Sequence, residues 1–173
     1  MTYNIFFSYS TANLATARKI CNYFKQIPNT EVFLCEDTVT VGQLTSDITA
    51  RINSCDMFIV LYDKSSHTSQ YVQNEIGVAT GANKPIIPLV LESQYLPTAM
   101  LTGKRYYPIW DGENWEVKLL ELYGYLEQKA NERNIADAVL VIGAILALGI
   151  LLFGGRNSKN LGSILDSYYI FQV

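Results

Sequence analysis

The sequence predicts a doubly wound α/β domain, and three observations support this fold class. Apolar runs of strand length alternate with segments in which apolar residues recur every three or four positions. The connections between these segments are short. The run at residues 57–62 is apolar almost throughout, which is typical of a strand buried on both faces of a parallel sheet.

The elements follow one another in a regular order along the chain. Strands are expected at residues 3–8, 31–35, 57–62, 85–91 and 108–110. Helices are expected at residues 14–24, around Ile48 and Ile52, at 69–81 and at 114–131. Pro28 ends the first helix, and the polar segment 64–68 is expected to be a loop. The predicted domain covers residues 1–133.

The helix that starts near Ser69 carries the most informative residues. Ser69 is a natural N-cap, and Val72 and Ile76 recur at helical spacing, so they can pack this helix onto the sheet. Tyr71 and Glu75 are four residues apart and share a neighbouring face of the helix. Because helical side chains lean toward the N-terminus, Glu75 is expected at the rim of the sheet. Taken alone, this stretch favours the interpretation of Glu75 as a solvated helix residue near the positive end of the helix dipole.

Polar residues stand where the predicted strands end, at residues 8–10, 36–37, 63–64 and 92. Ligands of doubly wound domains bind beyond the carboxyl ends of the strands, so these groups are expected to gather at the binding edge. Asp37 can contact a ligand hydroxyl or form a turn, and Ser69 can act in the site or only cap its helix. Lys64 can pair with a phosphate or remain solvated.

Composition excludes several classes of function. The chain has 173 residues and a formal net charge of −3, so a basic nucleic-acid-binding face is not expected. Three cysteines and one histidine lack the spacing of a zinc site or a disulfide framework, and no metal is predicted. The N-terminus shows no secretory signal, which predicts a cytoplasmic domain.

The sequence resembles the Toll/interleukin-1 receptor homology (TIR) domain family. The matching segments are residues 5–10, 32–37 with Gly42, 48–62, the pattern of Ser69, Tyr71 and Glu75, and residues 84–89. This resemblance implies a flavodoxin-like, doubly wound parallel five-stranded sheet. It also implies Glu75 as the catalytic residue of an NAD+-cleaving enzyme. The residues it implies for substrate binding are Phe7, Ser8, Tyr9, Asp37, Ser69 and Tyr71, the last standing where the family usually has tryptophan.

The implied reaction is cleavage of the nicotinamide–ribose bond of NAD+, with NAD+ as substrate and no cofactor. The products are nicotinamide and ADP-ribose or a cyclic ADP-ribose variant. The resemblance further implies activation by self-association, in which the loop 38–43 of one protomer completes the site of another, and a place in antiphage defence or immune-type signalling. The alternative is a non-enzymatic scaffold that binds other TIR proteins.

The C-terminal part of the chain differs in composition from the predicted domain. Residues 138–155 contain no charged side chain, and a helix of this length extends about 27 Å, close to the thickness of a bilayer core. The sequence therefore predicts a transmembrane or assembly helix at 136–155, which would anchor the protein to a membrane with the domain in the cytoplasm. Residues 156–173 are expected to form a short amphipathic tail.

Overall fold

The computed structural model describes residues 2–34, 46–110 and 115–153, with side chains described as far as residue 144. Asp37, the loop 38–43 and the tail 156–173 lie outside the described residues, so the predictions about them stay predictions. By its internal contacts the chain divides into two units, Met1–Arg133 and Asn134–Val173.

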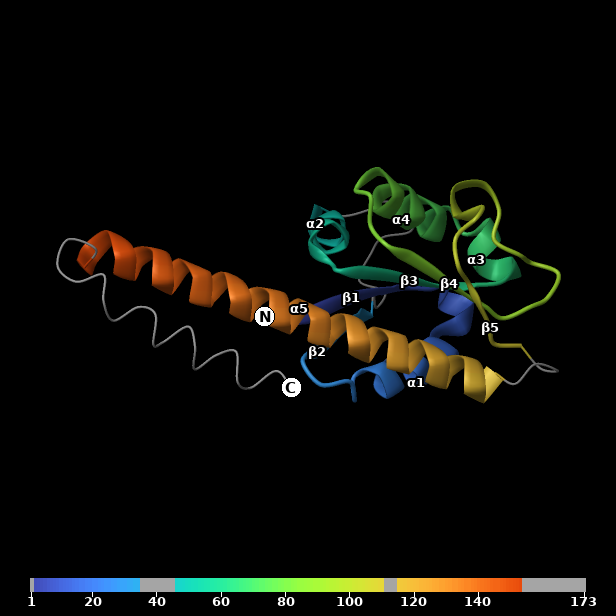
Figure 1. Ribbon diagram of the computed structural model, residues 1–173. Coiled ribbons are helices and arrows are strands. Elements are labelled where there is room, and N and C mark those ends of the chain that lie inside the picture. The colour runs from blue at the N-terminus through green and yellow to red at the C-terminus, as the bar shows by residue number, and fades with distance from the viewer. Residues whose placement is uncertain (1, 35–45, 111–114, 154–173) are drawn as a thin grey trace. The chain divides into compact units, whose positions relative to one another are not determined.

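Five parallel strands form one sheet, which confirms the predicted doubly wound fold class (Figure 1). Their order across the sheet, β2-β1-β3-β4-β5, is the flavodoxin-like order, in which the chain reverses direction beside β1. The strands are β1 Tyr3–Ser8, β2 Thr30–Leu34, β3 Met57–Tyr62, β4 Ile86–Val90 and β5 Tyr107–Pro108. All six residues of β3 are buried, as the apolar run predicts for a central strand.

The helices cover both faces of the sheet (Figure 1). They are α1 Leu14–Phe24, α2 Ser46–Ser54, α3 Lys64–Thr68, α4 Gln70–Gly81 and α5 Trp115–Phe153, with 3-10 turns η1 Thr11–Asn13 and η2 Ala99–Leu101. Helix α1 and the first part of α5 pack on one face of the sheet. Helices α2 and α4 pack on the other face.

The residues of β1 alternate between these two cores, because successive side chains of a strand point to opposite faces. Phe7 belongs to the core under α1 and α5. Phe6 belongs to the core under α2 and α4, where its ring stacks on Phe58 with the ring centroids 5.4 Å apart. The two cores lie on opposite faces of the sheet. A ligand site at the carboxyl ends of the strands can therefore lie on either face.

The segment expected to be a polar loop between β3 and α4 is instead the short helix α3. Asp63 caps its start, because the Asp63 carboxylate accepts a hydrogen bond from the Ser66 backbone N–H at 2.9 Å. The Ser66 hydroxyl in turn accepts from the Asp63 backbone N–H at 2.7 Å. This reciprocal pair is a capping box, and the sequence signal for it was an aspartate followed three residues later by serine.

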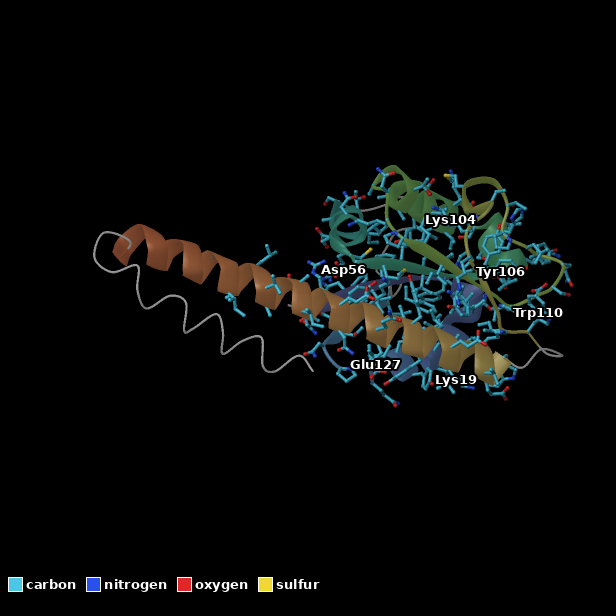
Figure 2. The ribbon with its side chains drawn as sticks, viewed as in Figure 1. Lys19, Asp56, Lys104, Tyr106, Trp110 and Glu127 are labelled. Carbon is cyan, nitrogen blue, oxygen red and sulfur yellow. The ribbon has the colours of Figure 1, made fainter. Side chains whose placement is uncertain are left out.

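Helix α5 is continuous over 39 residues, where two separate helices were expected. Residues 132–137 contain neither proline nor glycine, so no residue there ends the helix. Arg133 donates a hydrogen bond to Asp56, whose other carboxylate oxygen accepts from the Asn4 backbone N–H at 2.9 Å. Asp56 is labelled in Figure 2. These bonds fasten the end of the first unit to the amino edge of the sheet.

The structure does not support the membrane span predicted at 138–155. No helix in the described part of the chain is both long and apolar enough to cross a lipid bilayer.

Candidate functional site

Helix α4 brings the candidate site residues to the carboxyl edge of the sheet. The Ser69 hydroxyl accepts a hydrogen bond from the Val72 backbone N–H at 3.3 Å, which confirms that Ser69 is the N-cap. Val72 and Ile76 are buried in the core under α2 and α4. This packing fixes the rotation of the helix, and it turns Glu75 toward the sheet.

Glu75 lies against the end of β1. The Ser8 hydroxyl donates a hydrogen bond to Glu75 Oε2 at 2.5 Å, although the two residues are 67 positions apart in sequence. Both side chains are 0% exposed. A hydrogen bond between two buried side chains is stronger than one made in water, because the surroundings screen it less. Glu75 is therefore a buried carboxylate held by a hydroxyl, and not the solvated helix residue that the sequence also allowed.

Of the three adjacent residues expected to bind substrate at the end of β1, the structure brings only Ser8 to Glu75. Phe7 and Tyr9 are buried in the core under α1 and α5, on the opposite face of the sheet. The alternation of side chains along a strand separates them from Ser8. Their part in substrate binding stays a prediction.

Tyr71 lies one helical turn before Glu75 and is half-buried. It packs against the core under α2 and α4. An aromatic ring beside a carboxylate offers a surface on which a planar base can stack. The role of Tyr71 in binding substrate stays a prediction, as does that of Ser69 beyond its function as a cap.

A second buried carboxylate, Asp63, holds the neighbouring loop in place. It accepts hydrogen bonds from the Asn13 side-chain amide at 2.8 Å and from the Ser65 hydroxyl at 2.8 and 2.9 Å. Burial works to raise the pKa of Asp63, but the bonds from Asn13, Ser66 and Ser65 outweigh it and lower the pKa. Because Asn13 follows β1, these bonds join the segment after β1 to the segment after β3. No pattern in the sequence indicates this role of Asn13.

The single histidine has a structural partner. His67 Nδ1 and the Tyr62 hydroxyl are hydrogen-bonded at 2.9 Å, and the His67 ring also lies beside Tyr95. Within the described residues, no group of histidine, cysteine, aspartate and glutamate side chains could hold a metal ion. Lys64 is exposed at the start of α3. Of the two buried carboxylates at this edge, Asp63 accepts hydrogen bonds from Asn13, Ser65 and Ser66 and holds the loop. Glu75 is the carboxylate that can stabilise a positive charge developing beside it.

Comparison with known proteins identifies related families and structures. The family model of the TIR domain matches residues 5–123. Among solved structures, the chain is similar to the CMP N-glycosidase BcmB of Clostridium botulinum, with a TM-score of 0.50 and 23% identity over 70% of this chain and 98% of that chain. It is also similar to the TIR domains of the activated Roq1 resistosome recognising the effector XopQ, with a TM-score of 0.45, 12% identity and coverages of 79% and 99%. No curated protein matches the chain.

Proposed function

This chain belongs to the TIR domain family, and on that premise we propose that it cleaves the N-glycosidic bond between nicotinamide and ribose in NAD+. The products are nicotinamide and ADP-ribose or a cyclic variant. The observation that carries the proposal is the Glu75 carboxylate, which the Ser8 hydroxyl holds at the carboxyl edge of the sheet. Glu75 is the proposed catalytic residue, and Tyr71 is proposed to stack against the substrate.

One carboxylate is sufficient for this reaction. Nicotinamide is cationic while attached to ribose and neutral when it leaves, so no general acid has to protonate it. The barrier lies in the positive charge that develops on the ribose, as in glycoside hydrolysis. A water molecule then bonds to the ribose C1 carbon and loses a proton, which gives ADP-ribose; attack on the same carbon by another group of the ADP-ribosyl moiety gives a cyclic variant. An ionised Glu75 beside the ribose would stabilise this charge, and such an interaction lowers a barrier by roughly 3–4 kcal/mol.

Because Glu75 is buried, the proposal also requires a movement that exposes this side chain to the substrate. A side chain that is 0% exposed cannot contact NAD+ until a neighbouring segment moves. We infer that self-association of the TIR domains provides this movement, so activity is expected to rise with protein concentration. This places the enzyme in a signalling role in which assembly is the trigger, such as antiphage defence or immune-type signalling. A cytoplasmic location, where NAD+ is available, accompanies this role.

CMP is the second candidate substrate, because a structural neighbour is a CMP N-glycosidase. The two substrates make different chemical demands. Cytosine in CMP carries no positive charge, so its departure needs a proton donor, whereas nicotinamide leaves without one. A site centred on one carboxylate therefore favours NAD+.

A non-enzymatic scaffold is the competing function, and one specific observation favours it. The fully buried bond between Ser8 and Glu75 joins β1 to α4, and this could serve the stability of the fold alone. A scaffold would bind other TIR domains without cleaving any nucleotide.

Product analysis separates these possibilities. The full chain is incubated at low and high protein concentration with NAD+ or with CMP, and released nicotinamide or cytosine is measured by chromatography. The matched variants are Glu75→Gln, which keeps an oxygen that can accept from Ser8, and Glu31→Gln at an exposed position on β2. We expect nicotinamide release by wild type and Glu31→Gln and its loss in Glu75→Gln. Release of cytosine alone would identify CMP, and not NAD+, as the substrate. Release of neither base by the folded, assembled chain would rule out the enzyme and support the scaffold function.

A further inference from the structure

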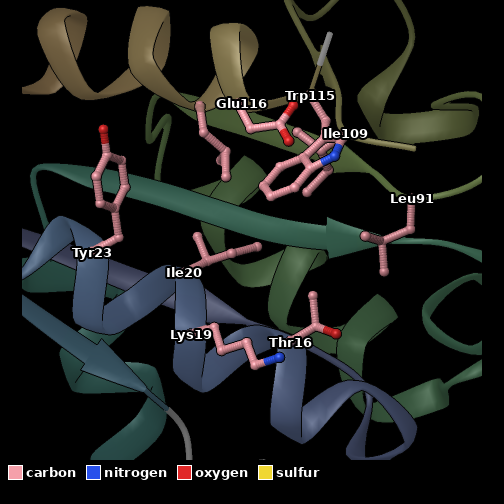
Figure 3. Close-up of a pocket in the computed structure, with 9 residues that line it drawn as sticks. Thr16, Lys19, Ile20, Tyr23, Leu91, Ile109, Trp115 and Glu116 are labelled. Carbon is pink, nitrogen blue, oxygen red and sulfur yellow. The ribbon is translucent and has the colours of Figure 1, made fainter. Parts of the chain in front are cut away.

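A hollow of about 530 Å³ lies between α1 and α5 (Figure 3). These helices pack on the face of the sheet opposite to α4, the helix that carries Glu75. Helix α1, helix α5 and the residues after β4 and β5 surround it. Its lining residues are Thr16, Lys19, Ile20, Tyr23, Leu91, Ile109, Trp115, Glu116 and Leu119. None of these residues is Ser8, Tyr71 or Glu75, so the hollow is separate from the proposed catalytic site. Its volume is in the range of about 300–1,000 Å³ that is usual for small-molecule sites.

Trp115 gives the hollow an aromatic wall. The indole extends into the space between α5 and α1, and the side chain is 41% exposed (Figure 3). Ile20 and Leu119 are buried at 6% and 9% exposure and form part of the apolar wall. A large ring left open beside an apolar wall is a surface on which a planar aromatic ligand can stack, burying area on both sides.

Two charged side chains stand at opposite sides of the hollow. Lys19 lies on α1 beside Thr16, and Glu116 lies on α5 beside Trp115 (Figure 3). Within the described part of the chain, neither Lys19 nor Glu116 makes a hydrogen bond or ion pair. An ammonium group suits a phosphate, and a carboxylate suits an N–H donor such as the exocyclic amine of a base.

We propose that this hollow binds an adenosine monophosphate moiety. The adenine ring stacks on Trp115, its amine donates a hydrogen bond to Glu116, and the phosphate pairs with Lys19. A planar ring that carries a donor amine and an anionic phosphate suits the aromatic wall and the two charged side chains that line the hollow. The proposal does not depend on NAD+ cleavage, because the probe, free AMP, has no nicotinamide bond.

Fluorescence of the full-length chain measures this binding directly. Trp110 and Trp115 are the two tryptophans of the sequence, so Trp110→Phe leaves Trp115 as the only tryptophan reporter. Titration of this variant with AMP is expected to change the emission of Trp115 until it saturates. Calorimetry on Trp115→Ala, with its fold checked by circular dichroism, is expected to show the loss of binding.

Ligand and protein variants test the two polar contacts separately. Lys19→Gln is expected to weaken AMP binding about tenfold and to leave adenosine binding unchanged, because adenosine lacks the phosphate. Lys104→Gln, an exposed lysine outside the hollow, is the matched control. Inosine monophosphate carries an acceptor where AMP carries its amine, so it is expected to bind more weakly than AMP. Glu116→Gln is expected to reduce this difference in affinity between the two nucleotides.

Three results would overturn the proposal. They are the absence of a saturable signal at millimolar AMP, an unchanged AMP affinity in Lys19→Gln, and loss of AMP binding in Glu75→Gln. The last result would place AMP on the other side of the sheet. If the chain does not cleave NAD+ but binds AMP as expected, the proposed reaction is refuted and the proposed AMP site stands.

Discussion

The two sides of the carboxyl edge of the sheet are built in opposite ways. On the α4 side, Ser8 and Glu75 are fully buried and joined by a 2.5 Å hydrogen bond. On the α1–α5 side, Trp115 is largely open, and Lys19 and Glu116 flank a hollow. The buried pair of Ser8 and Glu75 must become exposed before Glu75 can contact a substrate. The hollow is open and can accept a ligand without such a movement. A hollow that can accept a ligand and a fully buried carboxylate of one domain therefore need not belong to the same site.

The first prediction tests whether both faces of the sheet have firmly packed cores. Ile76→Ala on α4 and Leu122→Ala on α5 remove side chains that are 1% and 0% exposed. Each is expected to lower the free energy of unfolding by about 2–5 kcal/mol, because a buried cavity remains. Urea denaturation measures this, with Leu120→Ala as the control, since Leu120 is 61% exposed. A cost near zero for either buried residue would show that its helix does not pack on the sheet as described.

The second prediction compares hydroxyl groups on the two sides of the edge. Ser8→Ala leaves the buried Glu75 carboxylate without this donor and is expected to cost about 2 kcal/mol of unfolding free energy. Thr16→Val on the open side is expected to change it by less than about 0.5 kcal/mol. Equal effects in the same denaturation experiment would contradict the contrast between a closed and an open side.

The third prediction concerns pH. The pKa of Asp63 is lowered in the folded protein, so its ionised form contributes stability above the ordinary value of 3.8 and loses it as the pH falls through the lowered pKa. Asp63→Asn keeps a capping side chain but does not titrate. At neutral pH this variant is expected to be about 1 kcal/mol less stable than wild type. Unfolding measured from pH 7 to pH 2 should show this difference shrinking below pH 4, and a constant difference would contradict the assignment.

The smallest change in the free energy of unfolding is expected at the amino edge of the sheet, away from Glu75 and from the hollow. Arg133→Ala removes the ion pair with Asp56, in which the Arg133 side chain is 42% exposed. The expected loss is about 0.5 kcal/mol, because partly exposed ion pairs are weak. Thermal unfolding at low and high salt measures it, and a loss of several kcal/mol would assign this bond a larger part in holding α5.

Much of the fold could be predicted from the sequence, because local patterns determine it. The apolar run at 57–62 identified the central strand, and Ser69 identified the start of α4 through its cap. Helix α3 was missed because five polar residues resemble a loop unless the capping box after Asp63 is recognised. Helix α5 was divided in two because the change from charged to apolar composition was interpreted as a boundary, although nothing in between ends a helix.

The site was predicted less completely, because its contacts join residues far apart in sequence. Ser8 and Glu75 were each expected at the rim, but their hydrogen bond depends on how α4 packs on the sheet. The separation of Phe7 and Tyr9 from Ser8 follows from strand alternation alone and could have been predicted. The hollow beside Trp115 had no sequence signal, because four separate segments of the chain form it together.

The most direct test of the account compares activity and stability in Glu75→Gln. Nicotinamide release at saturating NAD+ and the urea midpoint of unfolding are measured on the same preparations of wild type and variant. Because glutamine can still accept from Ser8, the account predicts a fall in release rate of about 10²–10³-fold, with the midpoint nearly unchanged. A variant that cleaves NAD+ at the wild-type rate would contradict a catalytic Glu75. A variant that unfolds instead would assign the pair of Ser8 and Glu75 to the stability of the fold.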